Sequence, residues 1–197
     1  MQAAYDRIAA RYAAVNTDMP PETLAAAEHF LGLVESNARI LDLGCGPGRD
    51  MAWFDTHGAA VAGVDLSVGM LAQARLRACG LLAQMDMRHL AFQTGIFQGI
   101  WCNAALLHLP KREAPAALAE IHRVLTPGGM LSLSIQEGAE EVWERDPYCG
   151  IVERFFARYG GAEMLALLEG SGFAVQEHTF DQGKVRRWLR LLATATP

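Results

Sequence analysis

The sequence predicts an α/β fold, in which a mostly parallel sheet carries helices on both faces. Short apolar runs, typical of buried strands, alternate with amphipathic segments that are typical of helices. Glycines or prolines close most of these segments, as they do at the ends of strands and helices. The composition, 51% hydrophobic and 20% charged, is ordinary for a globular protein. In such an alternation, the helices cross over between successive strands and leave them parallel.

The N-terminal region predicts two helices. Tyr5, Ile8 and Tyr12 recur at helical spacing, so a helix over 3–14 presents them on one face. The two prolines at 20–21 open a second helix, because proline is tolerated in a first turn.

Strands and helices alternate from residue 39 onward. Strands are expected over 39–43, 60–64, 81–84, 99–104 and 130–135. Helices are expected over 50–56, 67–79, 113–125 and 163–169. The chain between 138 and 159 is polar, aromatic and irregular. The last expected strands, 173–180 and 185–194, form an antiparallel hairpin.

Charge and cysteine spacing argue against several classes of protein. The formal net charge of −5 gives no general attraction to phosphate backbones, so nucleic acid is not an expected partner. The basic run Lys184–Arg190 is interpreted as a charged edge strand. The cysteines lack a C-x-x-C spacing, and no histidines pair at metal-ligand spacing. No apolar run is long enough for a bilayer and no secretory signal is apparent, so we expect a cytoplasmic protein without a metal site.

The most informative stretch is Ile40–Asp50, which reads I-L-D-L-G-C-G-P-G-R-D. A buried strand runs into three glycines and then into a helix. Glycines let the backbone turn sharply and approach a ligand closely, and the helix beyond offers free N–H groups to an anionic moiety. The strand before and the helix and strand after give this turn the context of a nucleotide site.

The second expected strand ends in an acid, Asp65. A carboxylate at this position can accept hydrogen bonds from both hydroxyls of a ribose, and the alternative is a solvated residue that merely ends the strand. The dinucleotide fingerprint G-x-G-x-x-G requires glycine where Arg49 stands, which argues against the usual NAD arrangement.

These motifs together resemble the class I S-adenosylmethionine (SAM)-dependent methyltransferases. The resemblance rests on L-D-L-G-C-G-P-G at 41–48, G-V-D-L-S at 63–67, M-D-M at 85–87, and P-G-G at 127–129. It implies a Rossmann-like three-layer α/β/α sandwich of seven strands in the order 3-2-1-4-5-7-6. It also implies one domain over 1–197, with a helical cap over 1–37, a cofactor-binding core over 38–136 and an acceptor-side insertion over 137–162.

The resemblance further implies that SAM binds at the glycine turn and that S-adenosylhomocysteine (SAH) is the product. Asp42 would reach the methionine ammonium, Asp65 the ribose hydroxyls and Asp86 the adenine amino group. The implied cofactor contacts are Tyr12, Asp42, Gly44, Cys45, Gly46, Asp65, Leu66, Met70, Asp86, Met87 and Asn103. Met70 and Met87 can equally be core residues, and Tyr12 can serve only to pack its helix on the sheet.

His108 is the candidate general base, because it follows the fourth strand on the rim where acceptors sit in such folds. The alternative is that it only packs at the strand exit. The acceptor pocket is expected above the C-terminal edge of the sheet, built from the N-terminal helices and from 138–159. Tyr12, with or without Tyr5, is expected to close over the cofactor site. Aromatic residues that can line the acceptor pocket or form a small satellite core are Trp143, Tyr148, Phe155, Phe156 and Tyr159. Arginines that can hold an anionic acceptor or remain solvated are Arg145, Arg154 and Arg158.

The sequence thus predicts a methyltransferase that acts on a small-molecule acceptor, as a monomer or a homodimer, without a membrane partner. The alternatives are a non-catalytic SAM-binding regulator, an NAD(P)-dependent oxidoreductase on a similar fold, and methylation of nucleic acid.

Overall fold

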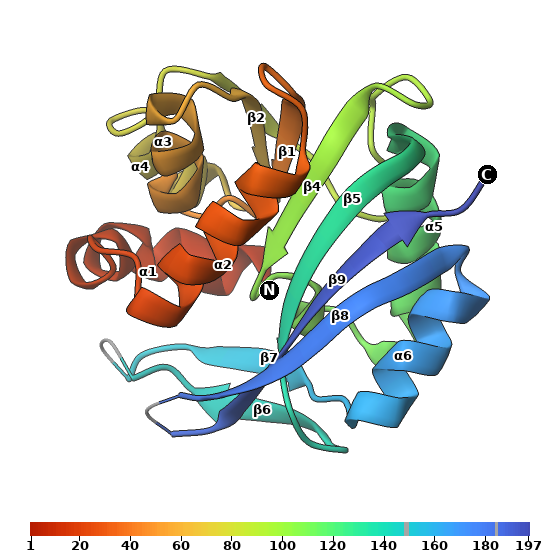
Figure 1. The fold of residues 1–197 in the computed structure, drawn as a ribbon. Helices are drawn as coiled ribbons and strands as arrows, with labels where there is room; N and C mark the ends of the chain where they lie inside the picture. The colour runs from red at the N-terminus through yellow and green to blue at the C-terminus, as the bar shows by residue number, and fades with distance from the viewer. Residues whose placement is uncertain (148–149, 184) are drawn as a thin grey trace.

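The computed structural model describes residues 1–147, 150–183 and 185–197 and has the predicted α/β class (Figure 1). The strands of its main sheet are β1 (Arg39–Leu43), β2 (Ala60–Asp65), β3 (Leu81–Gln84), β4 (Phe97–Asn103), β5 (Leu125–Gln136), β8 (Phe173–Gln182) and β9 (Arg187–Ala195). They lie in the order β3-β2-β1-β4-β5-β9-β8. Strands β1 to β5 pair in parallel, whereas β9 is antiparallel to both β5 and β8.

The expected strand order differs from this one only in the labels of the last two strands. Two further strands, β6 (Glu141–Arg145) and β7 (Glu153–Ala157), come earlier in the chain and form a small separate sheet. The expectation of irregular chain here was wrong. These strands depend on cross-strand pairs such as Trp143 with Phe155, which lie too far apart in sequence for local periodicity to reveal.

Helices cover both faces of the main sheet. They are α1 (Gln2–Val15), α2 (Pro21–Leu33), α3 (Arg49–Thr56), α4 (Val68–Ala74), α5 (Ala114–Val124) and α6 (Gly161–Gly170), with 3₁₀ turns η1 (Leu106–His108) and η2 (Lys111–Glu113). On one face, α2 and α3 pack around Ile40 and Trp101. On the other, α5 and α6 pack against Leu41 and Leu133. Alternate residues of a strand thus enter opposite cores, as the pleat requires.

Helix α1 is fastened to α4 at two points. Near its start, Asp6 accepts hydrogen bonds from Ser67 Oγ at 2.6 Å and from the backbone N–H of Gly69 at 2.9 Å. Near its end, Arg77 donates to the carbonyl oxygen of Ala13 at 2.6 Å. These contacts fix α1 beside the C-terminal end of β2, because α4 follows that strand directly.

Helix α4 ends at Ala74 rather than at Cys79, as the sequence analysis expected. The backbone N–H groups of Leu76 and Arg77 bond to the carbonyls three residues earlier, on Gln73 and Ala74. This tighter turn ends the α-helical pattern before the glycine that was expected to stop it.

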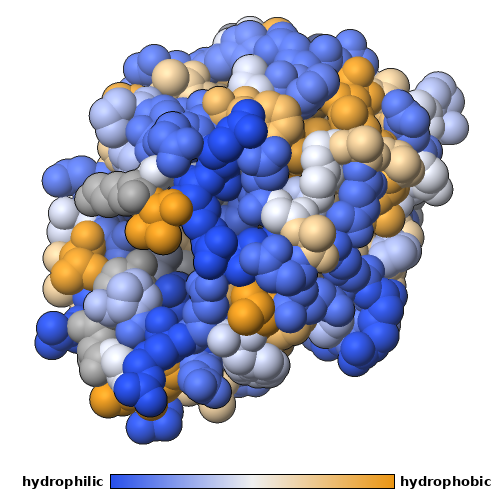
Figure 2. All heavy atoms as spheres, turned by 90° about the horizontal axis from the view of Figure 1, so that it is seen from below, coloured by the Kyte–Doolittle hydropathy of each residue, from blue (hydrophilic) through white to orange (hydrophobic). Residues whose placement is uncertain are grey.

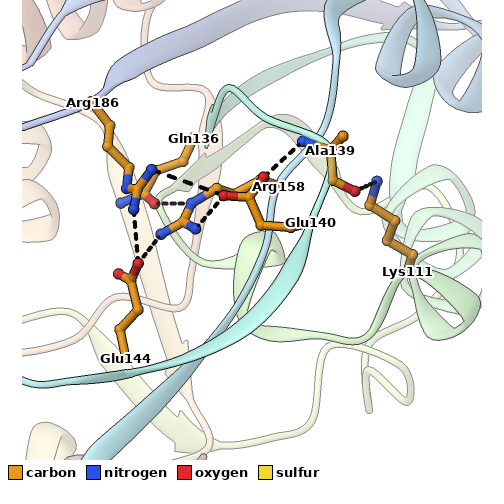
Figure 3. Close-up of polar contacts among 7 residues, drawn as sticks. All are labelled: Lys111, Gln136, Ala139, Glu140, Glu144, Arg158 and Arg186. Atoms are coloured by element: carbon orange, nitrogen blue, oxygen red, sulfur yellow. Dashed lines mark hydrogen bonds and ion pairs between the residues drawn. The ribbon is translucent and has the colours of Figure 1, made fainter.

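An ion-pair network joins the small sheet to the main one (Figure 3). The side chain of Arg158 is only 1% exposed. It donates to Gln136 Oε1 at 3.0 Å, to Glu140 Oε1 at 2.7 Å and to Glu144 Oε1 at 2.6 Å. Arg186 donates to the same oxygen of Glu144 at 2.9 Å. A buried guanidinium with this many charged partners holds the end of β5, the strand β6 and the start of β9 together.

The basic run before and along β9 is not an edge strand, so that interpretation was wrong. Strand β9 lies between β5 and β8. Its arginines are accommodated by acids: Arg187 lies 3.1 Å from Glu137, and Arg190 pairs with Asp181. Lys184 lies outside the described residues.

Seen from below the orientation of Figure 1, the surface is mainly hydrophilic, with apolar side chains in separate spots (Figure 2). Single exposed apolar residues such as Trp143 and Ile151 are normal on a protein surface. Within the part of the chain that the structure describes, no helix is long and apolar enough to cross a membrane.

Candidate functional site

A pocket of about 1140 Å³, including its open mouth, lies at the C-terminal ends of β1, β2 and β4. This is the edge at which ligands bind in open α/β sheets. The structure places every expected site residue in its lining: Tyr12, Asp42, Gly44, Cys45, Gly46, Asp65, Leu66, Met70, Asp86, Met87, Asn103 and His108.

The glycine turn after β1 has backbone conformations that favour glycine. Gly44, Gly46 and Gly48 have φ of 77°, 53° and 79°. A Cβ on Gly44 would lie 2.4 Å from that of Ala105, so no side chain fits there. A Cβ on Gly46 would meet no atom within 4 Å, so this backbone faces open space. The turn therefore leaves bare main chain along the pocket, as close approach to a ligand requires.

Asp65 stands at the tip of β2, beside this turn. Its Oδ2 accepts from the backbone N–H of Gly46 at 2.9 Å, and its Oδ1 accepts from that of Ser67 at 2.8 Å. Burial raises the pKa of Asp65, although these backbone donors act in the opposite direction. Each carboxylate oxygen can accept a second hydrogen bond, so the group remains able to receive ligand hydroxyls.

Asp42 is buried beneath the pocket and is 2% exposed. Among the described residues, its Oδ2 has no hydrogen-bond partner. Burial, and then the nearby charges of Asp50 and Asp65, raise the pKa of Asp42 well above its ordinary value. A buried carboxylate oxygen without a hydrogen-bond partner lowers the stability of the folded protein unless a ligand supplies that partner. The oxygen suits a cation or a hydrogen-bond donor.

Asp50, in the first turn of α3, organises the floor of the pocket. It accepts from Trp101 Nε1 at 2.9 Å, from Asn103 Nδ2 at 2.8 Å and from Arg49 Nε at 2.6 Å. Ser134 Oγ donates to Asn103 Oδ1 at 2.5 Å, which fixes the amide from its other side. Sequence reasoning missed Asp50, although an acid in the first turn after a glycine loop was the available signal.

The far end of the pocket carries the residues expected near adenine. Leu66 is 37% exposed, whereas Met70 is 1% exposed and so serves the core and the lining together. Arg88 donates to Asp86 from its backbone at 3.0 Å and from Nε at 2.9 Å. Arg88 also lowers the pKa of Asp86 through these hydrogen bonds. The carboxylate expected to contact adenine is thus ionised and held in place by its own neighbour.

The opposite end of the pocket is built from three distant segments. Tyr5 of α1 donates its hydroxyl to His108 Nε2 across 2.7 Å, and His108 Nδ1 lies 2.7 Å from the carbonyl oxygen of Phe155 in β7. Arg154 donates to the Tyr5 hydroxyl at 3.3 Å. Tyr12 packs edge-on against Tyr5 at 5.9 Å between ring centroids. Burial lowers the pKa of His108 to about 4, so its imidazole is neutral near pH 7.

Comparison with known proteins agrees with this geometry. Residues 40–129 match a family described as a methyltransferase domain. The malonyl-[acyl-carrier protein] O-methyltransferase of Enterobacter lignolyticus is 35% identical over 49% of this chain and 38% of its own length. The ubiquinone biosynthesis O-methyltransferase of Xanthomonas oryzae is 30% identical over 79% of this chain and 62% of its own length. The chain thus matches about two fifths to three fifths of these curated relatives.

A solved structure extends the likeness to the whole chain. The 1,6-didemethyltoxoflavin-N1-methyltransferase of Burkholderia thailandensis, solved with its substrate and SAH, superposes with a TM-score of 0.79. It is 22% identical and covers 100% of this chain and 87% of its own. Residues 40–129 thus match a methyltransferase domain, and the whole chain has the Rossmann-like fold of this solved methyltransferase. This fold is the one expected from the sequence.

The end of the pocket that holds Tyr5 and His108, where the acceptor was expected, differs from the expectation. Trp143, Phe155, Phe156 and Tyr159 do not line the pocket; Phe156 and Tyr159 belong to the main core. Tyr148 lies outside the described residues.

The expected arginines also have other surroundings. Arg158 is buried in the ion-pair network, and Arg154 reaches the pocket only through Tyr5. Sequence reasoning missed Gln2, Ala105 and Leu109 as lining residues, because nothing in their local sequence marks them. Among the described residues, no three metal-ligating side chains gather in a cluster.

Proposed function

We propose that the chain is a SAM-dependent methyltransferase that transfers a methyl group to a small-molecule acceptor. The observation that carries this proposal is the buried, unpartnered Oδ2 of Asp42 beside the bare glycine turn and Asp65. The named relatives support it, since two are O-methyltransferases and one was solved with its small-molecule substrate. That the protein acts as a monomer or homodimer stays a prediction.

The residues present fit the cofactor. Asp42 would hold the methionine ammonium, which supplies the donor that its oxygen lacks. Asp65 would accept the ribose hydroxyls, Leu66 would pack on the adenine, and the backbone N–H of Met87 would donate to a ring nitrogen. Gly44, Cys45 and Gly46 would line the amino-acid tail, and Asn103, fixed by Asp50, would contact the methionine moiety. Tyr12, Met70 and Asp86 complete the proposed cofactor contacts.

When bound, SAM would supply a methyl group activated by its sulfonium, which an acceptor atom can attack in line with the C–S bond, so that SAH leaves. The protein then has to hold the acceptor in line with the methyl carbon and exclude water. The aromatic ring of Tyr12 lines the site and can add cation–π attraction to a sulfonium. His108 is the group placed to take up a proton at the acceptor end.

Binding and product release test this function directly. Calorimetry with SAM, SAH and NADH should give heat for the first two only, and SAH should raise the melting temperature. Asp65→Ala should weaken SAH binding by about 1–3 kcal/mol, because charge-assisted hydrogen bonds are lost. The matched control is Asp55→Ala, an exposed acid on α3 outside the pocket, which should bind SAH as the wild type does.

Three results would contradict the proposal. The first is heat with NADH but not with SAH, which favours an oxidoreductase. The second is unchanged affinity in a folded Asp65→Ala variant. Asp65 also accepts hydrogen bonds from the backbone, so its replacement by alanine can disturb the turn itself. Asp65→Asn is therefore measured as well, because it keeps one acceptor oxygen and removes the charge. The third, SAH binding without methylation of any acceptor, favours a non-catalytic SAM-binding protein.

A further inference from the structure

The hydrogen-bond chain at the acceptor end has a defined direction. A carbonyl oxygen only accepts, so His108 Nδ1, at 2.7 Å from the Phe155 carbonyl, must carry a hydrogen. In the neutral ring, Nε2 is then an acceptor, and the hydroxyl of Tyr5 donates to it. Phe155 therefore sets the tautomer of His108, and His108 sets the direction of the Tyr5 hydroxyl.

The Tyr5 oxygen is also the point where a cation reaches the pocket. Arg154 donates to this oxygen at 3.3 Å, and its guanidinium lies 5.8 Å from the Tyr5 ring centroid. A positive charge there stabilises negative charge that develops on the phenol oxygen. A phenol oxygen has more than one lone pair, so a hydroxyl of an acceptor can donate to it beside Arg154. Tyr5 and His108 both line the pocket, so this oxygen is within reach of an acceptor.

We propose that Tyr5 is a catalytic residue, that the acceptor presents a hydroxyl group, and that its proton passes through the Tyr5 hydroxyl to His108 Nε2. This inference rests on the proposed methyltransferase function. It assigns the chemical class of the acceptor and makes His108 the final proton acceptor. The proton reaches His108 only through the Tyr5 hydroxyl.

The step balances in atoms and charge. A lone pair of the acceptor oxygen forms the new O–C bond, and the electrons of the C–S bond stay on sulfur. The acceptor proton moves to the Tyr5 oxygen while the Tyr5 proton moves to His108 Nε2. The positive charge thus passes from the sulfonium to the imidazolium, whose Nδ1–H still donates to Phe155. The imidazolium later releases its proton to water.

Burial makes His108 a weak base, and this suits a late proton transfer. The pKa of His108 is lowered to about 4 by burial, so it stays neutral until the attacking hydroxyl becomes acidic. A hydroxyl becomes strongly acidic as its oxygen bonds to carbon, and a weak base then suffices. A carboxylate acceptor is already ionised, so it has no proton for the Tyr5 and His108 pair to take.

Two matched probes separate these acceptor classes. The wild type is given SAM with 4-nitrophenol or with 4-nitrobenzoate at pH 6, where 4-nitrophenol keeps its hydroxyl proton and 4-nitrobenzoate is ionised, and release of SAH is followed. We expect turnover of 4-nitrophenol, with kcat lowered at least ~100-fold in Tyr5→Phe and in His108→Gln, and with KM changed less than about threefold. Tyr159→Phe is the matched control, because Tyr159 is buried outside the pocket, and its kcat should equal that of the wild type.

The contrary results are equally specific. Methylation of 4-nitrobenzoate alone, or full kcat in Tyr5→Phe, would overturn the inference. A loss carried by KM rather than kcat would mean that Tyr5 only binds the acceptor, and would overturn it too. Calorimetry with SAH separates failure of the proposed function from failure of the relay. If the wild type does not bind SAH, the proposed function is wrong. If the wild type binds SAH and Tyr5→Phe keeps full activity, only the relay is wrong.

A spectroscopic measurement decides the matter without any acceptor. In ¹⁵N-histidine-labelled protein with SAH, the shifts of His108 should show a protonated Nδ1 and an unprotonated Nε2 from pH 6 to 8. Tyr5→Phe should shift the Nε2 resonance, because it removes the donated hydrogen bond, while Tyr159→Phe should not. A protonated Nε2 would exclude it as the proton acceptor and overturn the relay. If neither probe is methylated, the protonation of the two His108 nitrogens is the measurement that tests the relay.

Discussion

The two ends of the pocket differ in charge and in the way they are assembled. The cofactor end carries two acids, the buried Asp42 and the half-buried Asp65, and desolvation raises the pKa of both. The acceptor end carries a neutral imidazole, His108, and the cation Arg154 that acts through Tyr5. An acidic end suits an ammonium and hydroxyl groups, and a neutral end beside a cation suits an acceptor that must lose a proton. One pocket thus holds two environments that favour opposite charges.

The ends also differ in how much chain they need. The acids and glycines of the cofactor end come from two adjacent strands and the turns that follow them, 39–48 and 60–67. The acceptor end needs three elements: η1 contributes a residue 103 positions after Tyr5 of α1, and β7 contributes one 149 positions after it. We therefore expect the cofactor end to depend on local backbone geometry and the acceptor end on tertiary contacts.

Gly44→Ala should have the largest effect, and it should lower both the stability of the protein and the affinity of the cofactor end for SAH. The new Cβ would lie 2.4 Å from that of Ala105 on a backbone with φ of 77°. We expect a loss of about 3 kcal/mol in stability and more than ~100-fold in SAH affinity. The control is Gly170→Ala, where a Cβ meets no atom within 4 Å and which should be neutral or stabilising. Retained SAH affinity in Gly44→Ala would show that the turn does not form the cradle.

Arg158→Met tests whether the small sheet is held independently of the cofactor end. Removing the buried guanidinium leaves Glu140 and Glu144 with only the more exposed Arg186 as an ion-pair partner. We expect a loss of about 2–3 kcal/mol in the free energy of unfolding, less than for fully buried pairs because both glutamates are partly exposed. Affinity for SAH should stay within about twofold of the wild type. Denaturant titration and calorimetry measure the two quantities, and a parallel fall in both would refute this independence.

The same network predicts a dependence on acid. The backbone N–H groups of Ala139 and Glu140, and then Arg158, lower the pKa of Glu140 to about 2 from an ordinary 4.5. A lowered pKa stabilises the fold above pH 4.5, and that contribution is lost as the pH falls from 4.5 towards 2. The wild type should therefore lose more stability over this range than Arg158→Met does. Equal slopes of stability against pH in the two proteins would contradict the assignment.

Asp42 should couple cofactor binding to proton release. Its raised pKa means that the empty site holds a proton at a pH where a free carboxyl is ionised. An ammonium favours the ionised form, so SAH affinity should rise with pH, by at most about tenfold per unit, until the pH passes the pKa of Asp42 in the free protein. Calorimetry in buffers of different ionisation enthalpy should detect the released proton in the wild type and not in Asp42→Asn.

Tyr159→Phe should have the smallest effect and should leave both ends of the pocket unchanged. Its hydroxyl is buried without a hydrogen-bond partner among the described residues. Burial, and then the charges of Glu163 and Glu141, raise the pKa of this phenol. Replacing it should raise the free energy of unfolding by roughly 1 kcal/mol, because an unsatisfied buried group is removed. A destabilised variant would indicate that the hydroxyl is bonded.

The contrast between the two ends explains what the sequence could predict. The alternation of strands and helices, the glycine turn and Asp65 follow from short-range patterns, because the sharp turn between a strand and a helix favours glycine at Gly44, Gly46 and Gly48. The strand order came from the resemblance to class I methyltransferases. His108 was placed correctly at the rim for the same reason, since it follows β4 directly. Its partners were not predictable, because Tyr5 and Phe155 meet it only after the chain has folded.

The errors have the same physical origin. Strands β6 and β7 are stabilised by pairing with each other, as between Val142 and Phe156, rather than by a periodic apolar pattern. The basic residues before and along β9 suggested an edge strand. They lie on an inner strand because acids on neighbouring elements form ion pairs with them, as Asp181 does with Arg190. Local propensity carries no information about either of these partners.

The most direct test of the whole account is calorimetry of SAH binding to the wild type and to Asp42→Asn. The account predicts a single site in the wild type and an affinity about 10–100-fold lower in the variant, because a charge-assisted hydrogen bond to a buried carboxylate is lost. The variant should remain folded, since Oδ2 of Asp42 bonds to no described residue. No heat with the wild type, or equal affinity in the two proteins, would contradict the cofactor site.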